Sequence, residues 1–398
     1  MDAIRNPYTP GAGSRPPALT GRDAEIQAFR ILVERIRQGR PEKSLLITGL
    51  RGVGKTVLLS TFRDLAESAG FKTAESEVTH DTSFKQMMAR LGRRVLLELN
   101  PIEKAKDKAL HAARVFKAFT LKLPGGFEIG MDIDAIRGKA DSGNLSEDLS
   151  DLFFALGDAA REKRTGVMFL FDEIQFLERG DMEALIAALH YVTQRGLPVT
   201  VVGAGLPQLP KLAGEAKSYA ERLFNFPSID RLSDQAARDA LVKPALEQGV
   251  EYTADATGGI VEYTEGYPYF LQEYGKHVWN IAERSPISLA DVVRAQIGVQ
   301  AQLDENFFRV RIGRTTAAER RYVSAMASLG RGPYKSGDIA AELGTDSPRV
   351  APLRNQLITK GLIYSPSHGI TNFTVPQFDD FLRRCFPFTQ ASKTAKRS

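Results

Sequence analysis

Short apolar runs alternate with longer amphipathic segments over roughly the first 230 residues of the chain. Continuous apolar runs bounded by turn residues are typical of strands buried on both faces of a parallel sheet. Such strands are predicted at residues 44–48, 167–173 and 199–203, and residues 71–78 look like a further strand. Apolar residues recur at helical spacing around them, at about residues 20–37, 55–69, 83–99, 145–162 and 182–195. This alternation predicts an α/β fold with a doubly wound parallel sheet.

The pattern changes along the chain and divides it into five parts. The Pro- and Gly-rich start predicts a flexible arm, and the charged end predicts a disordered basic tail. Within the α/β domain, a basic helix and an alternating stretch around Pro124-Gly125-Gly126 predict an insertion with a β-hairpin. The predicted bounds are 1–18 for the arm, 19–230 for the α/β domain with its insertion at about 101–144, 231–312 for a wholly helical domain, 313–386 for a C-terminal domain and 387–398 for the tail.

The C-terminal domain has the pattern of a winged helix. Three helices are predicted at about residues 319–329, 338–343 and 347–360, and two short strands at 362–364 and 371–375 would pair as the wing. In a helix-turn-helix the third helix would present four polar residues to the major groove of DNA: Arg349, Arg354, Asn355 and Lys360.

Two observations keep a second role for this domain open. Pro352 lies inside the third helix, where it removes one backbone hydrogen bond. Nine basic and six acidic residues between Glu319 and Arg384 leave a charge of only 9 − 6 = +3. DNA contact and contact with protein, within the chain or outside it, are therefore both retained as hypotheses.

A glycine-rich loop follows the first predicted strand and precedes a predicted helix. The sequence GLRGVGKT matches the phosphate-binding pattern Gly-x4-Gly-Lys-Thr, with Gly49, Leu50, Arg51, Gly52, Val53, Gly54, Lys55 and Thr56. The glycines let the backbone curl so that N–H groups point at phosphate oxygens, and the helix N-terminus adds positive charge. Lys55 would reach the β- and γ-phosphates, and the Thr56 hydroxyl would ligate Mg²⁺. The loop therefore predicts binding of ATP with Mg²⁺.

The apolar strand predicted at residues 167–173 ends in two acids. Asp172 ends a parallel strand, where a ligand in the crevice of the sheet would lie, and we assign it to the Mg²⁺ shell. Glu173 is placed to orient and activate the attacking water, so it joins Lys55 as a candidate catalytic residue. Gln175 has two interpretations: a contact to water or a neighbouring strand, or an ordinary polar role in a loop.

These motifs together resemble one branch of the P-loop proteins. The segments that carry the resemblance are LTGRDAEI, GLRGVGKT, FLFDEIQ, VVGAGLPQL, ERLFNF and EGYPYFLQ. They look like the AAA+ ATPases of the origin-recognition-like and archaeal-type group, which are related to the STAND switch proteins. The resemblance covers about residues 19–385 and implies a P-loop NTPase domain, a helical lid at 231–312 and a C-terminal winged helix.

The resemblance also implies that four residues outside the loop lie near the adenine. These are Gly21 and Arg22 before the first helix, and Gly266 and Pro268 of the lid. Taken alone, Gly21 is a glycine at a helix start and Pro268 a proline in a first turn, so a purely structural role stays open for both.

Sensor residues of this branch have only partial counterparts here. The strand at 199–203, which commonly ends in a polar side chain near the γ-phosphate, continues as Gly203-Ala204-Gly205. The lid segment EGYPYFLQEYGKHVW has no arginine at the usual place. Arg222 is the remaining sensor candidate, and a surface ion pair is an equally good interpretation of it.

Composition excludes some classes of protein. The 398 residues are 43% hydrophobic and 25% charged, as in an ordinary globular chain of two or three domains. The net charge of 53 − 48 = +5 includes three positive residues of the tail, so it does not indicate nucleic-acid binding. A single cysteine, Cys385, allows neither an internal disulfide nor a cysteine metal site, and the five histidines have no metal-ligand spacing. Without a secretory signal or an apolar run long enough for a bilayer, we expect a cytoplasmic protein with no membrane partner.

Two functional hypotheses follow. The first is a Mg²⁺-dependent ATP-binding protein that hydrolyses ATP and serves as a nucleotide-controlled switch or assembly factor, with or without a link to duplex DNA. The second is a DNA-binding winged-helix regulator in which ATP only stabilises assembly, with little or no hydrolysis. The resemblance implies that a homo-oligomer or another protein partner could be needed to complete the site.

Overall fold

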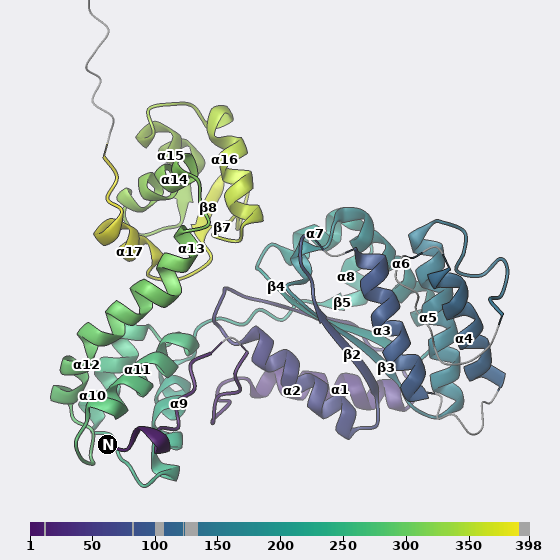
Figure 1. Cartoon of the computed structure of the whole chain (residues 1–398), viewed down its shortest axis with the longest axis horizontal. Helices are drawn as coiled ribbons and strands as arrows, with labels where there is room; N and C mark the ends of the chain where they lie inside the picture. The colour runs from purple at the N-terminus through teal and green to yellow at the C-terminus, as the bar shows by residue number, and fades with distance from the viewer. Residues whose placement is uncertain (12, 82, 100–106, 122, 124–133, 390–398) are drawn as a thin grey trace, which may run out of the picture. The chain divides into compact units, whose positions relative to one another are not determined.

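The computed structural model consists of two compact units (Figure 1). It describes residues 1–11, 13–81, 83–99, 107–121, 123 and 134–389. The sheet unit comprises Gly21–Gly49 and Gly54–Ile229, and the C-terminal unit comprises Met1–Thr20, Leu50–Val53 and the described chain from Asp230 onward. The β-hairpin predicted around Pro124 and the tail from residue 390 lie outside the described residues.

A five-stranded parallel sheet organises the sheet unit. Its strands are β1 (Ser44–Thr48), β2 (Lys72–Glu77), β3 (Val167–Asp172), β4 (Val199–Gly205) and β5 (Phe224–Asn225). Their order across the sheet is β2-β3-β4-β1-β5, and each neighbouring pair is parallel. Leu45 pairs with Val202, and Phe171 pairs with Gly203. This register brings the carboxyl ends of β1, β3 and β4 to the same edge of the sheet.

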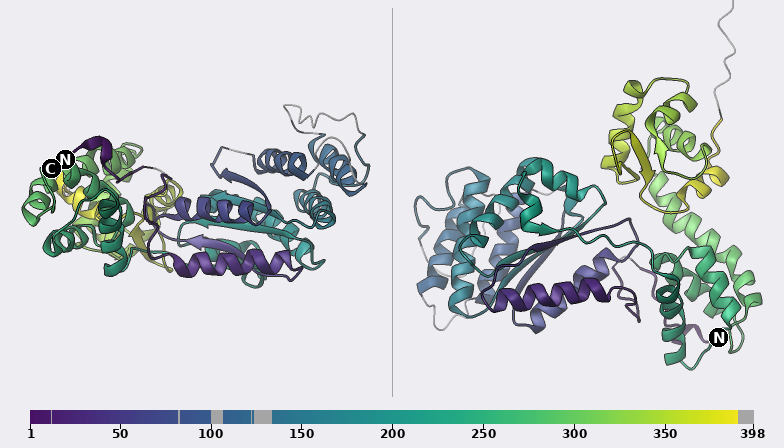
Figure 2. Two further views of the ribbon diagram at one scale, coloured as in Figure 1. Left: turned by 90° about the horizontal axis from the view of Figure 1, so that it is seen from below. Right: turned by 180° about the vertical axis from the view of Figure 1, so that it is seen from behind.

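Helices cover the sheet on both faces, as its buried strands require. They are α1 (Asp23–Arg37), α2 (Lys55–Ser68), α3 (Phe84–Leu99), α4 (Asp107–Thr120), α5 (Leu145–Glu162), α6 (Arg179–Thr193), α7 (Leu209–Ala216) and α8 (Ala220–Leu223). Phe169 of β3 stacks on Phe153 of α5 with 4.9 Å between ring centroids. Phe29 of α1 stacks on Phe62 of α2 at 4.1 Å, and these two helices run side by side (Figures 1 and 2). The predicted α/β fold with a parallel sheet is confirmed.

The C-terminal unit begins with packed helices that follow the sheet unit in sequence. They are α9 (Asp234–Glu247), α10 (Ala254–Thr264), α11 (Pro268–Ile281) and α12 (Leu289–Gln302), followed by the π-helical segment η3 (Leu303–Arg309) and the short α13 (Val310–Ile312). Trp279 and Tyr274 of α11 are fully buried among them. Ser288 caps α12 in a reciprocal pair of hydrogen bonds with Asp291, which fixes where this helix begins. The helical pattern predicted after residue 231 is confirmed.

Residues of the N-terminal arm contact this group of helices. A short turn, η1 (Ala3–Arg5), precedes Tyr8, whose ring is buried. The Tyr8 hydroxyl donates to the carbonyl of Leu241 at 2.6 Å, and the Trp279 indole donates to the carbonyl of Asp2 at 2.9 Å. Gly275 explains the fit, since a Cβ there would lie 2.7 Å from the Tyr8 ring.

The rest of the unit holds four helices and a small antiparallel sheet. The helices are α14 (Ala317–Ser328), α15 (Ser336–Glu342), α16 (Ser347–Thr359) and α17 (Phe378–Cys385), and the strands β6 (Tyr334–Lys335), β7 (Ile363–Tyr364) and β8 (Ile370–Phe373) pair in the order β6-β8-β7. Helix α16 continues through Pro352. Its N-cap is Asp346, which accepts a hydrogen bond from the backbone of Arg349.

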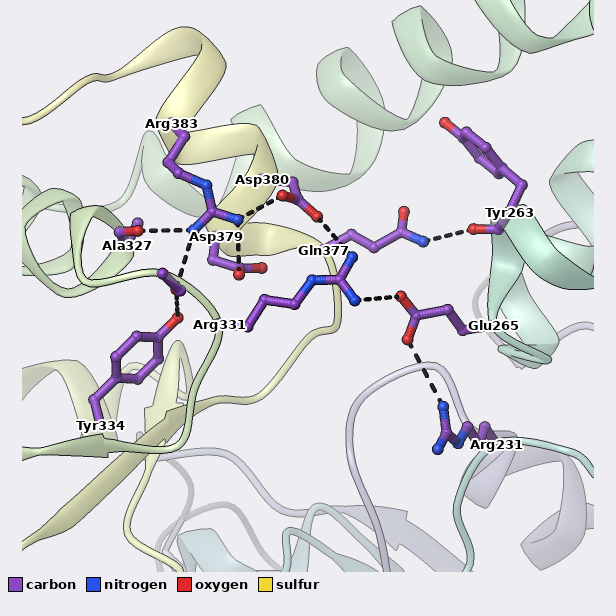
Figure 3. Close-up of polar contacts among 11 residues, drawn as sticks. Arg231, Tyr263, Glu265, Ala327, Arg331, Tyr334, Gln377, Asp379, Asp380 and Arg383 are labelled. Atoms are coloured by element: carbon purple, nitrogen blue, oxygen red, sulfur yellow. Dashed lines mark hydrogen bonds and ion pairs between the residues drawn. The ribbon is translucent and has the colours of Figure 1, made fainter.

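Polar contacts link α10 to residues around α17 inside the C-terminal unit (Figure 3). The carboxylate of Glu265 lies 3.8 Å from Arg231 and 3.6 Å from Arg331. The amide of Gln377 donates to the carbonyl of Tyr263 at 2.7 Å. Arg331 also approaches Asp380, at 3.7 Å. Long ion pairs of this kind each contribute at most about 1 kcal/mol, so the contact is specific in geometry without being strong.

No helix among the described residues is long and apolar enough to cross a bilayer.

Candidate functional site

The glycine-rich loop owes its curl to two residues with left-handed backbones. Gly54, at the N-cap of α2, has φ of 95°, and Gly52 has φ of 87°. Side chains at these angles would be strained, which accounts for glycine at both positions. Gly49 begins the loop, and its N–H donates to the carbonyl of Gly205 at 3.1 Å, so the loop starts from the end of β4 as well as from β1.

Lys55 and Thr56 open helix α2 and turn toward the edge of the sheet. The Lys55 side chain is 6% exposed, and its Nζ donates to the carbonyl of Gly49 at 3.0 Å. The Thr56 Oγ1 donates to Asp172 Oδ2 at 2.6 Å, although 116 residues separate the two in sequence. The fold therefore joins the two predicted Mg²⁺ ligands directly.

Asp172 is held in place from both of its oxygens. Its Oδ1 accepts the backbone N–H of Glu173 at 2.8 Å, while Oδ2 accepts from Thr56. Burial raises the pKa of Asp172, and these two hydrogen bonds oppose the rise without cancelling it. Burial disfavours the ionised form of a carboxylate, and a cation beside the carboxylate stabilises that form.

The donor set at this point fits Mg²⁺. A hydroxyl and a carboxylate are the oxygen ligands that a hard cation prefers, and Mg²⁺ commonly takes only one or two protein ligands beside phosphate and water. The described residues include no cluster of three or more His, Cys, Asp and Glu that could hold a metal alone. The chemistry of Thr56 and Asp172 thus suits an ion that arrives with a phosphorylated ligand.

Glu173 has an unusual backbone for its residue type. Its φ of 51° and ψ of 35° lie in the left-handed region, which non-glycine residues seldom occupy. The short turn η2 (Ile174–Phe176) follows it at once. The amide Nε2 of Gln175 donates to Glu173 Oε2, and Gln175 Oε1 accepts the backbone N–H of Leu206 at 3.1 Å. A contact of Gln175 to the neighbouring strand was one of its two predicted roles.

The tip of the glycine-rich loop belongs to the C-terminal unit. The backbone N–H of Arg51 donates to the carbonyl of Thr374 at 3.1 Å, and the N–H of Tyr269 donates to the carbonyl of Gly52 at 3.3 Å. A Cβ on Gly361 would lie 2.6 Å from the Arg51 guanidinium, so this side chain rests on the glycine backbone. Residues 50–53 therefore contact both α11 and the segment after β8.

Arg311 lies near this tip and was missed by sequence reasoning. Burial, followed by the charge of Arg51, lowers the pKa of Arg311 to about 10, and the side chain stays cationic near neutral pH. Its guanidinium lies 3.8 Å from the centre of the Phe307 ring and donates to the Phe307 carbonyl. The usual place of a sensor arginine is the lid segment at residues 265–279, whereas Arg311 follows the π-helical segment η3. No local pattern in the sequence marks it.

The remaining predicted nucleotide residues occupy structural turns in their own units. In the sheet unit, Gly21 has φ of 65° and Arg22 is the buried N-cap of α1. In the C-terminal unit, Pro268 is the first residue of α11, and the carbonyl of Gly266, which has φ of 71°, accepts the N–H of Leu232 at 2.9 Å. Arg222 is exposed on α8.

Helix α16 uses two of its four predicted DNA-contact residues internally. Arg354 Nη1 donates to Ser336 Oγ at 3.0 Å, and Lys360 Nζ lies 2.7 Å from the buried carboxylate of Glu319. Burial alone would raise the pKa of Glu319, but the bonds from Lys360 and Thr316 outweigh it and lower the pKa. Arg349 and Asn355 are exposed.

Comparison with known protein families places these residues in context. The family model of the AAA ATPase domain matches residues 18–202, which include the glycine-rich loop, Asp172 and Glu173. This match supports ATP hydrolysis as the activity, in agreement with the predicted ATPase. Residues 305–382 match a second model, described only as a domain of unknown function, DUF8462. No curated protein matches the chain.

The similarity to solved structures extends beyond the residues that match the AAA ATPase domain. A Walker-type ATPase of Pyrococcus abyssi matches with a TM-score of 0.57 at 16% identity, over 93% of this chain and 97% of that one. Lower TM-scores accompany the Aeropyrum pernix Orc1 protein in complex with DNA (0.46, 16% identity, 93% and 94% covered) and the Thermotoga maritima RuvB Holliday junction branch migration motor (0.47, 14%, 94% and 99%). The likeness to the Pyrococcus structure shows a P-loop NTPase fold, as predicted.

Proposed function

We propose that this protein hydrolyses ATP with Mg²⁺ at the edge of the sheet formed by β1, β3 and β4. The observation that carries the proposal is the 2.6 Å hydrogen bond between Thr56 and Asp172, which brings two hard oxygen ligands together at the mouth of a phosphate-binding loop. These two residues would hold Mg²⁺, and the ion would neutralise charge on the β- and γ-phosphates.

The other roles follow from what each side chain can reach. The backbone N–H groups of residues 52–56 cradle the phosphates, since the loop curls at Gly52 and Gly54 and leads into the N-terminus of α2. Lys55 is buried beside the loop and exchanges its bond to the Gly49 carbonyl for phosphate oxygens. Glu173, one residue beyond Asp172, orients a water molecule and accepts its proton during attack on the γ-phosphate.

The direct test is ATP turnover by the full chain and by Glu173→Gln. We expect Glu173→Gln to lower kcat by about 10²- to 10⁴-fold, because it removes the general base, while ATP affinity changes little. Turnover should be measured against protein concentration, with and without duplex DNA, since a partner subunit or DNA could complete the site. A wild-type rate that never exceeds that of Glu173→Gln under any of these conditions would rule the hydrolysis out.

We further propose that the nucleotide acts as a switch on the C-terminal unit, whose residues 313–386 we interpret as a winged helix. Arg51 and Gly52 of the loop bond to Thr374 and Tyr269, so phosphate binding at the loop would act on contacts of that unit. Arg222 stays the candidate γ-phosphate sensor. The small-angle scattering profiles of the protein with ADP and with a non-hydrolysable ATP analogue should differ. Identical profiles would contradict the proposed switch.

A DNA-linked role is the second candidate, because Arg349 and Asn355 are exposed on the helix predicted to enter the major groove. The DNA named for the Orc1 structure belongs to that protein, and here it motivates only the choice of duplex DNA as a probe. A cytoplasmic location, where ATP is available, is consistent with either candidate.

A further inference from the structure

The end of β4 lacks the side-chain hydrogen-bonding group expected beside a γ-phosphate. Gly203, Ala204 and Gly205 occupy that place, and the space is already filled. A Cβ on Gly203 would lie 2.7 Å from Leu46 and 3.1 Å from Ile174, and a Cβ on Gly205 would lie 2.7 Å from the side-chain oxygen of Gln175. Leu46 of β1 and Ile174 therefore take the room at position 203, and Gln175, in the turn after β3, takes it at position 205.

Gln175 joins the ends of the two strands through both atoms of its amide. Its Oε1 accepts the backbone N–H of Leu206, immediately after β4, at 3.1 Å, and its Nε2 donates to the carboxylate of Glu173 after β3. The side chain is 9% exposed, so water competes little for these bonds. A flipped amide would set its NH₂ against the Leu206 N–H and its oxygen against the Glu173 carboxylate, so only one orientation satisfies both partners.

The backbone on the Glu173 side is constrained as well. Glu173 has a left-handed backbone, and its carbonyl accepts the N–H of Phe176 at 3.0 Å, which closes the turn η2. The carboxylate is thus fixed from the main chain by the turn and from its tip by the amide.

We propose that Gln175 is a positioning residue that holds the Glu173 carboxylate in register with the end of β4. The inference rests on the hydrolysis proposed above. Gln175 supplies from the turn after β3 what a polar side chain on β4 would otherwise supply, and it acts through Glu173 without touching the nucleotide. Gly205 of β4 is required because it leaves room for this amide.

The test compares Gln175→Met, Glu173→Gln and the double variant in the full chain. Methionine keeps the length and volume of glutamine but can neither donate to Glu173 nor accept from Leu206 as a strong partner. Loss of a group that orients a catalytic residue typically costs about 10- to 100-fold in activity. We expect that loss in kcat for Gln175→Met, with KM and the ATP dissociation constant unchanged. The matched control is Gln194→Met at the exposed end of α6, which should keep the wild-type rate.

The double variant separates positioning from a direct role. If Gln175 acts only through Glu173, Gln175→Met should cause no further loss in the Glu173→Gln background. An additional loss there, or a weaker ATP affinity with unchanged kcat, would show that Gln175 touches the nucleotide or the water itself and would overturn the proposal. So would a Gln175→Met rate equal to that of the wild type.

A second variant tests the same geometry without changing Gln175. Gly205→Ala places a methyl group 2.7 Å from the amide oxygen and should lower kcat by displacing it, whereas Gly214→Ala on α7, where a Cβ meets nothing within 4 Å, should not. Hydrogen exchange at the Leu206 amide should accelerate in both Gln175→Met and Gly205→Ala. Unchanged exchange in both variants would refute the proposed link of Gln175 between Glu173 and Leu206. If the wild type itself does not exceed Glu173→Gln in turnover, the proposed function fails, and the positioning role fails with it.

Discussion

The edge of the parallel sheet and helix α16 both carry polar residues that could meet a charged ligand, and the fold uses them differently. At the edge of the sheet, Thr56 bonds to Asp172, so two candidate ligands of one ion hold each other in place. On α16, Arg354 bonds to Ser336 and Lys360 to Glu319, so two candidate DNA contacts are committed to the domain's own scaffold. The residues at the edge of the sheet are arranged to bind an ion, whereas the two residues of α16 are used in contacts within their own domain.

The difference teaches what a spaced motif specifies that a charged helix does not. The glycine-rich pattern places glycines where the backbone is left-handed, at Gly52 and Gly54, so the spacing of the motif predicts the conformation of the loop. A basic residue on a helix predicts no such geometry, because the direction of its side chain depends on which acid the tertiary fold brings near it. For Lys360 that acid is Glu319, 41 positions earlier in the chain.

The largest expected effect is at the sheet edge, in Lys55→Met. Methionine keeps the apolar stem but removes the ammonium group, and a hydrogen bond to a charged partner contributes about 2–3 kcal/mol. We expect ATP affinity to fall roughly 30- to 150-fold, measured by titration calorimetry in Mg²⁺. Lys43→Met is the control, since this exposed lysine bonds to the Glu221 carbonyl and should leave the affinity unchanged. An equal loss in both variants would mean that the effect is general charge and not the loop.

The next effect lies on the other side of the comparison, in Lys360→Met. This change leaves the Glu319 carboxylate, which is 1% exposed, without its cation, although the backbone N–H of Thr316 still donates to it. We expect the free energy of unfolding of the C-terminal unit to fall by about 2 kcal/mol. Urea unfolding can be followed through the fluorescence of Trp279, which lies in the same unit. Lys335→Met, at an exposed position, should cost almost nothing, and a similar loss there would contradict a specific pair.

Much of the fold followed from periodicity, and the reasons are local. Helix α5 and strands β1 and β3 match their predicted ranges within a residue, because buried runs and amphipathic stripes are properties of neighbouring residues. Thr56 and Asp172 were each predicted as Mg²⁺ ligands, Asp172 because it ends a parallel strand, where a ligand in the crevice of the sheet would lie. The direct bond between the two side chains is what the structure adds.

Other features depend on partners far away in sequence, and no local pattern could supply them. Arg311 gains its place near Arg51 only through the packing of the C-terminal unit. The amide of Gln175 has its role because a glycine at position 205 leaves room for it, 30 residues later. The N-terminal Tyr8 fits because position 275 is also glycine. For Gln175 and Tyr8, the absence of a side chain at one position decides what another residue does.

A smaller effect concerns the acidity of the site. Burial raises the pKa of Asp172 above its ordinary value, and only the ionised carboxylate binds Mg²⁺. As the pH falls through this raised pKa, protons displace the metal, so Mg²⁺-dependent ATP affinity should decline about tenfold per pH unit and begin to do so at a higher pH than an ordinary aspartate would cause. Titrations with Mg²⁺ and with a chelator separate the metal-dependent part, which alone should show the decline. A constant ratio of the two affinities down to pH 4 would place the metal elsewhere.

The smallest effect distinguishes exposed Arg349, whose ion pair with Asp346 is long at 3.7 Å, from Arg354, which is bonded to Ser336. If duplex DNA binds, Arg349→Ala should weaken it only a few-fold and reduce the slope of log affinity against log salt by about 1, since one phosphate contact is lost. Arg354→Ala should leave the slope unchanged, because this side chain is bonded to Ser336, and should lower the stability of the C-terminal unit instead. Fluorescence anisotropy with a labelled duplex at several salt concentrations measures both slopes. A reduced slope for Arg354→Ala would mean that its bond to Ser336 opens on DNA, and the contrast between the sheet edge and α16 would then no longer hold.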